Sequence, residues 1–353
     1  MENTILIQLL TNIAVFSSLL FIPLMAREMG ISYFGLGLIL GVFNLACFLS
    51  TYFFGILADR YGVRKILRSG LIISALFYAL QMLIHDKYSL FWWRAGAGFS
   101  AGIFPAALSV YAFSEREGKM GRFIAFGSLG WAIASFLDGI IGSYNMIFLM
   151  GSVFFLVSFF ISAGFGEICC QRDARFFPLP IFRKNLRIYL PYFLRNLAAQ
   201  TIWAIFPLYL LATGADKFMV GIAYFINGLA QFYMMQKVEH KNNMYLINLG
   251  LLTSVLTFIA YAVIGNYWLV LPVQVMLAYS FSTLQVGANQ EVLKNNREKA
   301  SASGLLNSLL NFSAIGGPVL AGVVMQYYGF PGVMWSASAI AFVGLISYTK
   351  VLK

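Results

Sequence analysis

Six residues between positions 55 and 65 combine a carboxylate, basic groups and glycines where one apolar segment ends and the next begins. They are Gly55, Asp59, Arg60, Gly62, Arg64 and Lys65. A carboxylate at a helix end beside a basic cluster can form a switchable ion pair, and glycines permit a tight turn. The basic residues also favour a cytoplasmic position for this turn. We interpret residues 55–65 as a charge-relay hinge.

Two charged residues in consecutive apolar segments, Arg94 and Asp138, are candidates for a buried ion pair. A guanidinium group inside a membrane needs a partner. At a rise of about 1.5 Å per residue, Arg94 lies about 9 Å and Asp138 about 6 Å from the same membrane face. We expect the two to pair in a gate or a proton-transfer site. In the alternative interpretation, Asp138 is close enough to that face to be hydrated.

A third charge, Arg195, lies six residues inside its apolar segment. It either snorkels to the interface or serves as a cation in a central cavity, among neutral polar side chains and a tryptophan wall. The candidate cavity residues are Asn12, Asn196, Gln200, Trp203 and Gln231. If Arg94 faced the same cavity, an anionic or strongly hydrogen-bonding solute would be favoured. Glu291, near the inner end of its segment, is a further gate candidate that could equally pair with a basic loop.

Small residues recur at helical spacing in two apolar segments. Gly98 and Gly102 follow Arg94 at intervals of four, and Gly317 precedes Pro318 in a glycine-rich run. Glycines on one helix face let a neighbouring helix approach closely. We therefore expect these residues to serve helix packing rather than ligand binding.

The composition places all of these residues in a bilayer. The 353 residues are 60% hydrophobic and 10% charged, with a mean hydropathy of +0.79, whereas soluble domains carry roughly a quarter charged residues. This excludes soluble enzymes, disordered tails and secreted disulfide scaffolds. The net charge of +11 lies between apolar segments, which indicates topology rather than nucleic-acid binding. The three cysteines have no metal-ligand spacing, so we expect no cofactor and no metal.

Apolar segments of about 20 residues, the length that spans a bilayer, predict twelve helices. An all-helical fold is required because lipid offers no partners for backbone groups, and alternation typical of a membrane barrel is missing from the sequence. The predicted ranges are 4–26, 32–54, 66–84, 88–113, 123–142, 145–166, 189–213, 218–236, 244–265, 268–293, 300–325 and 330–348.

The distribution of basic residues predicts the orientation. With the N-terminus inside, 19 of the 24 Lys and Arg residues lie on the inner face, three lie outside, and Arg94 and Arg195 lie within helices. This bias predicts that both termini are cytoplasmic. Aromatic residues at the proposed outer helix ends, Trp92, Trp93, Tyr144 and Trp268 among them, fit an interfacial belt.

The chain divides into two related halves. Residues 167–187 are rich in basic residues and separate an N-terminal bundle, 1–166, from a C-terminal bundle, 188–353. Positions about 184 or 180 apart match: Asn12 with Asn196, Pro23 with Pro207, Gly30 with Gly214, Gly37 with Gly221 and Ser74 with Ser254. Because six helices is an even number, the halves form a parallel repeat, as in transporters whose halves rock about a midplane site. The pattern predicts alternating access.

The 55–65 motif, with the 6+6 layout, resembles the major facilitator superfamily, and most closely its drug/proton antiporter-like branch. The resemblance implies a fold of two pseudo-symmetric six-helix bundles and a cytoplasmic gate in which Asp59 faces the start of the eleventh helix, near Ser301. Some features depart from the family pattern. Glu239, His240 and Asn242 replace the second copy of the motif, and the first helix has no carboxylate. Drug/proton antiport therefore stays one option.

The sequence thus predicts a secondary transporter, not an enzyme, because His85 and His240 fall on opposite faces and no catalytic set is recognisable. We expect a monomer in the cell membrane that moves a small organic solute by rocker-switch alternating access, with efflux as one option and import as the other. A proton or a sodium ion is the expected coupling partner, and nucleic acid is not a partner. One alternative is a uniporter or exchanger of an organic anion that uses Arg94 and Arg195. A more remote alternative is a membrane receptor or enzyme.

Overall fold

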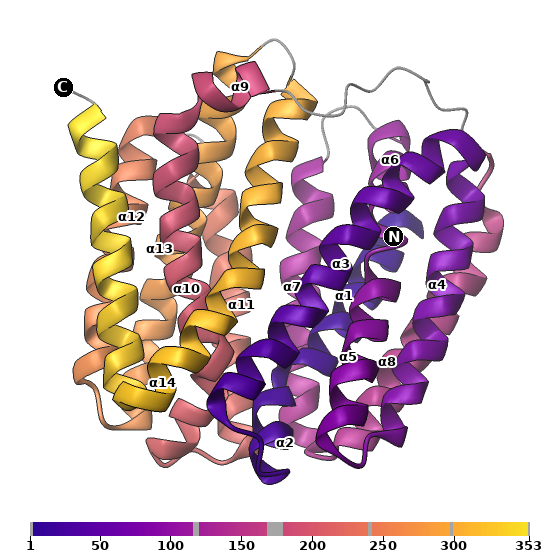
Figure 1. Ribbon diagram of the computed structural model, residues 1–353. Coiled ribbons are helices and arrows are strands. Elements are labelled where there is room, and N and C mark those ends of the chain that lie inside the picture. Colours follow the sequence, from indigo (N-terminus) through magenta and orange to yellow (C-terminus); the bar gives the residue numbers. More distant parts are fainter. Residues whose placement is uncertain (1–2, 116–119, 168–178, 239–241, 297–298, 352–353) are drawn as a thin grey trace. The chain divides into compact units, whose positions relative to one another are not determined.

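The computed structural model describes residues 3–115, 120–167, 179–238, 242–296 and 299–351 (Figure 1). Every regular element in these ranges is a helix, which confirms the predicted all-helical fold. The α-helices are α1 Asn3–Leu20, α2 Ile22–Glu28, α3 Tyr33–Tyr61, α4 Val63–Leu80, α5 Lys87–Ala101, α6 Pro105–Glu115, α7 Met120–Ile141, α8 Tyr144–Ile161, α9 Leu179–Lys184, α10 Leu186–Ala212, α11 Lys217–Val238, α12 Asn243–Val263, α13 Tyr267–Asn295 and α14 Lys299–Val351. Two short 3₁₀ turns, η1 Gln81–Leu83 and η2 Ser162–Gly164, follow α4 and α8.

Two predicted helices are divided in the structure. The range 4–26 forms α1 and α2, which meet at Phe21, and Pro23 lies in the first turn of α2. The range 88–113 forms α5 and α6, and Pro105 is the first residue of α6. Proline has no backbone N–H and is best accommodated in the first helical turn, where both of these prolines lie. The predicted continuous helices were therefore wrong at these two points. Pro191 and Pro207, in contrast, lie inside the continuous helix α10.

Two further boundaries differ from the prediction. The ranges 300–325 and 330–348 are joined in α14, whose backbone leaves helical geometry at Gly329, with φ 64° and ψ −167°. A positive φ of this kind favours glycine, so Gly329 marks the bend between two crossings. The linker 167–187 contains the short helix α9, and α10 begins at Leu186 rather than at Tyr189.

Helix α5 begins with a well-formed N-cap that positions Arg94 two turns further along. The Asp86 carboxylate accepts a hydrogen bond from Ser89 N at 2.7 Å, and Ser89 Oγ accepts one from Asp86 N at 3.0 Å. This reciprocal capping box satisfies two backbone donors at the helix start. The hydrogen bonds from Ser89 also hold the pKa of Asp86 below its ordinary value.

The chain forms two compact units. Unit 1 contains Met1–Ile31, Val42–Ala174 and Asp216–Phe225. Within it, α1 packs against α7 and α8, and α4 packs against α5 and α8. Its core includes Tyr78 and Phe155, whose rings meet edge to face with centroids 4.8 Å apart.

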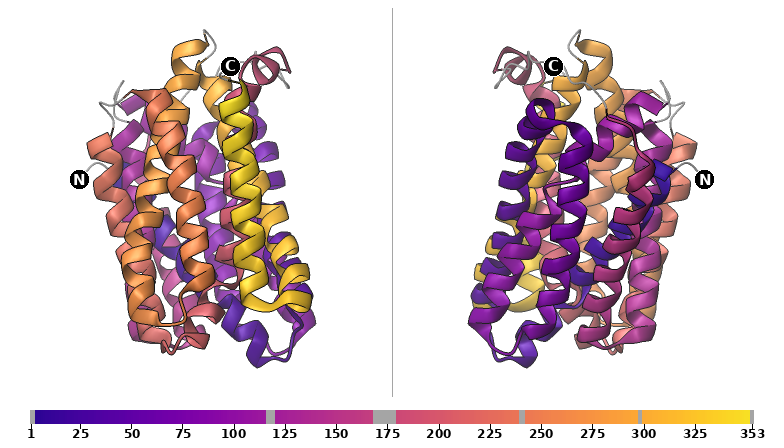
Figure 2. Two further views of the ribbon diagram at one scale, coloured as in Figure 1. Left: turned by 90° about the vertical axis from the view of Figure 1, so that its left-hand side faces the viewer. Right: turned by 90° about the vertical axis from the view of Figure 1, so that its right-hand side faces the viewer.

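Unit 2 contains Ser32–Gly41, Arg175–Ala215 and Ile226–Lys353. Helix α10 packs against α14, and α12 packs against α13 and α14, so that these helices run side by side (Figures 1 and 2). The core of the unit is built around Tyr189, Tyr192, Leu251, Leu284 and Tyr348.

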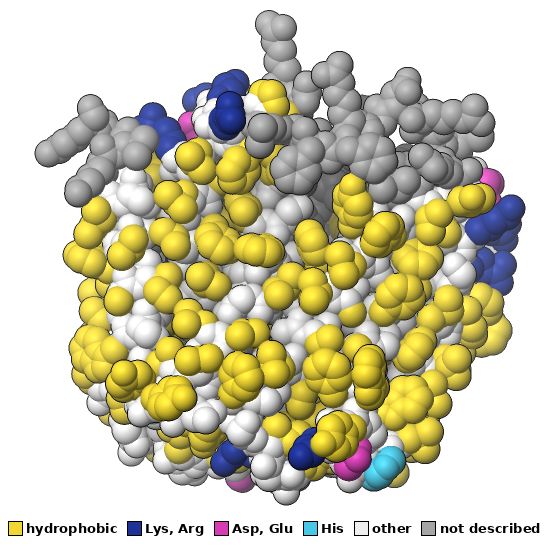
Figure 3. All heavy atoms as spheres, viewed as in Figure 1, with side chains coloured by type: hydrophobic (Ala, Val, Ile, Leu, Met, Phe, Trp, Pro, Cys, Tyr) yellow, Lys and Arg dark blue, Asp and Glu magenta, His cyan; other side chains and the backbone are white. Residues whose placement is uncertain are grey.

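The surface is that of a membrane protein. Hydrophobic side chains cover most of the face shown in Figure 3, and the Lys and Arg side chains gather near the helix ends. Among the described residues, nine helical stretches are long and apolar enough to cross a membrane, and one of them, Leu305–Thr349, has 45 residues. That length suffices for two crossings of about 20 residues each.

Gly98 of α5 allows a test of the packing in unit 1. A Cβ at Gly98 would lie 2.2 Å from the backbone oxygen of Phe43, whereas a Cβ at Gly164 would meet nothing within 4 Å. We expect Gly98→Ala to lower the free energy of unfolding by about 1–3 kcal/mol, as overpacking does. Thermal unfolding of the purified protein would measure this, with Gly164→Ala as the matched control. Equal melting temperatures for the two variants would contradict the packing.

Candidate functional site

The hinge predicted at residues 55–65 is a turn between two helices. Helix α3 ends at Tyr61, α4 begins at Val63, and Gly62 between them has φ 106°. Only Gly62 therefore forms the turn. The expectation that Gly55 also belongs to the turn was wrong, because Gly55 lies inside α3, where its position for a Cβ is 3.6 Å from Ala106 Cβ.

The basic residues of this hinge lie at the start of α4. Arg64 Nη2 donates a hydrogen bond to the carbonyl oxygen of Ala163 at 2.8 Å, which ties α4 to the turn η2 directly after α8, and Lys65 is exposed. The side chains of Asp59, Arg60 and Ser301 lie outside the part of the chain that the structure describes. The expected contact between Asp59 and the eleventh helix therefore stays a prediction.

Arg94 is fully buried in unit 1. Its Nη1 donates hydrogen bonds to Gln81 Oε1 at 2.8 Å, to Ser18 O at 3.1 Å and to Ser18 Oγ at 3.2 Å. The guanidinium carbon also lies 4.1 Å from the centre of the Phe43 ring. Arg94 thus joins α1, η1, α3 and α5 through neutral groups and an aromatic face.

The predicted Arg94–Asp138 pair was wrong. Neither carboxylate oxygen of Asp138 has a hydrogen-bond partner among the described residues, although the side chain is fully buried. The hydroxyl of Ser17 lies beside this carboxyl group. The two charges face adjacent residues of α1, Ser18 and Ser17, so similar depth in the membrane did not bring them together.

Arg195 is equally buried, in unit 2, with a relative exposure of 2%. Its Nε donates to Ser254 Oγ at 2.8 Å, Nη2 donates to Ser280 Oγ at 3.0 Å, and Nη1 donates to Asn196 Oδ1 at 3.2 Å. The guanidinium carbon lies 5.4 Å from the centre of the Phe281 ring. The snorkelling interpretation is therefore wrong, because the guanidinium group binds α12 and α13 in the interior of its unit.

The two arginines have related structural roles that sequence reasoning missed. Arg94 ties its helix to α1 and to the end of the α4–η1 segment, and Arg195 ties α10 to α12 and α13. Each arginine therefore links the first, third and fourth membrane-spanning segments of its own sequence half. The sequence match between Ser74 and Ser254 could have identified Ser254 as a partner of Arg195. The match does not extend to the contacts, because Ser74 Oγ has no hydrogen-bond partner among the described residues.

The predicted cavity residues separate into two groups. Asn12 belongs to unit 1, and its Nδ2 donates to Gln8 O at 2.8 Å. The other four belong to unit 2. There Gln231 Nε2 donates to Asn227 Oδ1 at 2.7 Å, and Asn227 Nδ2 donates to Gln274 O at 2.8 Å. This amide chain joins α11 to α13, and sequence reasoning had found only its Gln231 end.

The remaining unit 2 candidates have local contacts. Asn196 donates to Tyr192 O at 2.8 Å, and Trp203 packs against Phe206 with ring centroids 5.3 Å apart. Gln200 lies against Gly317, where an added Cβ would be 2.4 Å from Gln200 Cβ. This close approach agrees with a packing role for the Gly317–Pro318 segment.

Glu291 accepts hydrogen bonds from two amides. Asn243 Nδ2 donates to its Oε2 at 3.1 Å, and Asn295 Nδ2 donates to its Oε1 at 3.0 Å. These hydrogen bonds link the beginning of α12 to the end of α13. The side chains of the nearby loop residues Lys241, Arg297 and Lys299 lie outside the described part of the chain, so pairing of Glu291 with a basic loop stays a prediction.

Two close helix crossings repeat between the units. In unit 2, a Cβ at Gly37 of α3 would lie 2.4 Å from Pro318 O of α14. In unit 1, a Cβ at Gly221 of α11 would lie 2.5 Å from Ser135 O and 2.8 Å from Gly139 Cα of α7. Gly37 and Gly221 are 184 positions apart, so the repeat seen in the sequence recurs as matching contacts. Each crossing joins a helix of one sequence half to a helix of the other.

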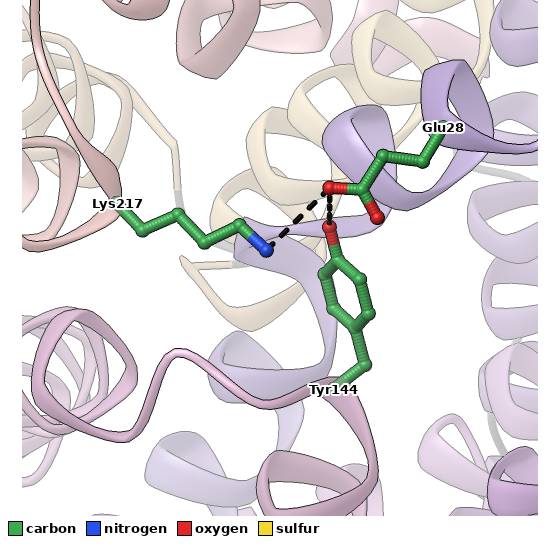
Figure 4. Close-up of polar contacts among 3 residues, drawn as sticks. All are labelled: Glu28, Tyr144 and Lys217. Carbon is green, nitrogen blue, oxygen red and sulfur yellow. Dashed lines mark hydrogen bonds and ion pairs between the residues drawn. The ribbon is translucent and has the colours of Figure 1, made fainter.

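The distal end of unit 1 carries a polar cluster that sequence reasoning missed. The distal end is the end where α2 finishes and α8 and α11 begin. Lys217 Nζ lies 3.5 Å from Glu28 Oε1 and 4.4 Å from the centre of the Tyr144 ring, and Tyr144 OH donates to Glu28 Oε1 at 2.7 Å (Figure 4). We call these three residues the distal latch. The latch ties α11, from the second half, to α2 and α8, from the first.

The structural role of Arg195 can be tested directly. We expect Arg195→Gln to lower the free energy of unfolding by about 2–4 kcal/mol, because hydrogen bonds to a buried charged group are lost. Thermal unfolding measures this effect, with Arg187→Gln, at an exposed position of the same helix, as the control. A variant of normal stability that no longer binds solute would instead indicate a cavity role.

The distal latch should bias opening without determining the fold. Exposed ion pairs contribute about 1 kcal/mol or less, which corresponds to about a fivefold change in an equilibrium. We expect Lys217→Glu to raise the labelling rate of a single cysteine introduced at Ser143 by up to this factor, because Glu28 would then face a like charge. The reversed pair, Glu28→Lys with Lys217→Glu, should restore slow labelling. Fast labelling of the reversed pair would contradict an electrostatic latch.

Comparison with known proteins places this geometry in a family. The profile described as Major Facilitator Superfamily matches residues 4–295. The class H tetracycline resistance protein of Pasteurella multocida is 25% identical over 327 residues, which cover 83% of this chain and 80% of the relative. The quinolone resistance protein NorA of Staphylococcus aureus is 23% identical over 352 residues, which cover 92% of this chain and 89% of NorA.

Solved structures share the fold. The nucleoside transporter NupG superposes with a TM-score of 0.80 at 15% identity and covers all of both chains. The human organic anion transporter MFSD10 superposes with a TM-score of 0.73 at 18% identity over 98% of both chains. The family match spans most of the sequence, and its members are transporters rather than enzymes. The chain therefore belongs to the Major Facilitator Superfamily and is a multi-pass membrane transporter.

Proposed function

We propose that this transporter exports a small amphipathic organic solute in exchange for protons. The observation that carries the proposal is the similarity, over most of the chain, to a tetracycline resistance protein and a quinolone resistance protein. Resistance to a compound is achieved by a transporter that lowers its internal concentration, and export against a gradient needs an energy source such as a proton gradient. The solute is proposed to contact the amide and aromatic candidates Asn12, Asn196, Gln200, Trp203 and Gln231.

We propose a rocker-switch motion of residues 1–166 against residues 188–353, with 167–187 as the linker. The two matching crossings, at Gly37 and at Gly221, support this proposal because each joins the two halves through backbone contacts. At these two glycines no side chain stands between the helices, so the backbone contacts can part and re-form. In unit 1 the distal latch also joins the two halves, and it adds a weak, reversible contact.

The opposite end is proposed to close through Asp59. Gly62 allows α3 and α4 to meet in a tight turn, and Arg64 fixes that turn to α8. Asp59 lies in the last turn of α3, where family resemblance predicts contact with the start of α14. A helix N-terminus attracts a carboxylate through its unpaired N–H groups.

The protein is proposed to act as a monomer in the cell membrane with both termini in the cytoplasm, in accordance with its basic-residue distribution. In this orientation the distal end faces outward. Exchange of an organic anion through Arg94 and Arg195 is less favoured. Both side chains are buried and are hydrogen-bonded to neutral groups of their own units.

Transport in proteoliposomes tests the proposed function. With a more acidic compartment on the side opposite a tetracycline-containing solution, we expect tetracycline uptake at least about fivefold faster than without a gradient, since a pH difference of one unit supplies about 1.4 kcal/mol. Nigericin should abolish the difference, and Asp59→Asn should slow it. Norfloxacin and uridine serve as comparison solutes. Rates independent of the pH gradient for all three solutes would contradict proton-coupled export.

A further inference from the structure

Asp138 is a buried carboxyl group that no described residue neutralises. It lies in the last turn of α7, near the distal end, and its side chain is inaccessible to solvent. Neither oxygen forms a hydrogen bond of normal geometry with a described residue, and the polar group beside the carboxyl group is the neutral hydroxyl of Ser17. No described basic side chain lies within ion-pair distance of it.

Such surroundings accept the neutral acid and not the carboxylate. Transfer of an isolated carboxylate from water into an apolar interior is so unfavourable that the group binds a proton instead. Removal of that proton needs water or a cation close to the oxygens. In this conformation, the buried carboxyl group therefore carries a proton.

The residue that follows Asp138 lies at a contact that joins the two halves. Gly139 lies against α11, with its Cβ position 3.1 Å from Phe218 O and 3.2 Å from Gly221 Cα. Three residues before Gly139, the Phe136 ring centroid is 5.3 Å from that of Phe225. The Asp138 carboxyl group lies beside Ser17 of α1, and α11 closes the adjacent side of α7. Movement of α11 away from α7 would open that adjacent side to water.

We propose that Asp138 is a proton-binding site that is occupied when the distal α7–α11 crossing is closed and that loses its proton when the crossing opens. This inference rests on the proposed function in that it requires the distal end to open. Closure takes up one proton from the solution at the distal end. Acid therefore favours the closed form, and alkali favours the open form.

The matching crossing in unit 2 lacks such a group. There Gly37 packs against Pro318, and the segment 317–322 of α14, Gly-Pro-Val-Leu-Ala-Gly, contains no titratable side chain. The proton dependence thus comes from one of the two related crossings. Packing of two helices at such a crossing does not require a carboxyl group, as the crossing in unit 2 shows. We therefore assign Asp138 a chemical role rather than a packing role.

The other charged and titratable groups on the neighbouring elements have partners of their own. Glu28 of α2, Tyr144 of α8 and Lys217 of α11 bind one another in the distal latch. Arg27 of α2 donates to the carbonyl oxygen of Ile31, and the Tyr224 ring of α11 lies against the Trp131 ring of α7. The packed segment of α1 presents Ser17, which does not titrate. The buried carboxyl group of Asp138 is therefore distinct from the ion pair at the rim.

Distance measurements on the full chain in lipid nanodiscs test the proposal without any transported solute. Spin labels would be placed at Ser143 and Phe218, after replacement of the three native cysteines by serine. We expect the closed-to-open ratio to rise as pH falls from 8.5 to 5.5, by up to about tenfold per unit. Asp138→Asn should stay closed throughout, and Asp138→Glu should keep a pH response.

The matched control is Asp216→Asn, an exposed carboxylate at the distal end that caps α11 through Met219 N at 2.7 Å. Asparagine also caps helices, so this variant should respond like the wild type. A pH response that persists in Asp138→Asn, or a ratio that rises with alkali, would overturn the proposal.

A second measurement uses the wild-type protein, so it does not depend on the folding of a variant. Infrared spectroscopy of the wild-type closed form at neutral pH should show the carbonyl band of a neutral, buried carboxylic acid, and absence of this band would overturn the proposal. Tetracycline transport that fails while both signals are present would refute the proposed cargo and leave the proton site intact. Transport driven by a pH gradient in the absence of both signals would refute the proton site at Asp138 and leave the proposed function intact.

Discussion

The exclusion of water from the bilayer interior is the constraint on which this structure depends. Each polar group in a crossing must find its partner inside the protein. Arg94 meets this requirement with Ser18, Gln81 and the Phe43 ring, and Arg195 meets it with serine hydroxyls on two other helices. The arginines therefore determine which helices stay together within a unit. Asp138 is the contrasting case, and a proton can supply what the described side chains do not.

The joints between the two halves follow a different rule. At Gly37 and Gly221 the helices touch through backbone atoms, so packing is close at these two points. The α7–α11 crossing also includes the ring pair Phe136–Phe225. Close packing recovers dispersion energy over many atom pairs. This close approach requires a residue without a side chain, which explains why glycines occupy these positions.

Electrostatic contacts at the distal end contribute on a smaller scale. The Glu28–Lys217 pair is partly exposed, with side-chain exposures of 56% and 36%, and such a pair contributes little because water screens it. A weak contact is appropriate where two conformations must have similar free energies. A deeply buried ion pair at the same joint would hold one state too firmly for a cycle.

Much of the fold could be predicted because a helix spanning lipid needs only a long apolar run, and the 55–65 motif also predicted the family. The predictions placed Pro23 and Pro105 inside continuous helices, whereas the structure breaks the helix just before each of them. Proline alone does not specify a break, because α10 continues through Pro191 and Pro207. Partner choice could not be predicted in the same way. Arg94 and Asp138 have similar depths, yet depth does not specify the direction in which a side chain leaves its helix.

By itself, the sequence determined the helical class, the repeat and the residues whose charge is costly in lipid, since these depend on composition and order along the chain. Only the tertiary structure decided that Arg195 binds Ser254 and Ser280, and that Glu28 meets Lys217. These partners are separated by many residues, and their contact depends on helix rotation and crossing geometry. Packing of all the helices together sets both quantities, so no single segment encodes them.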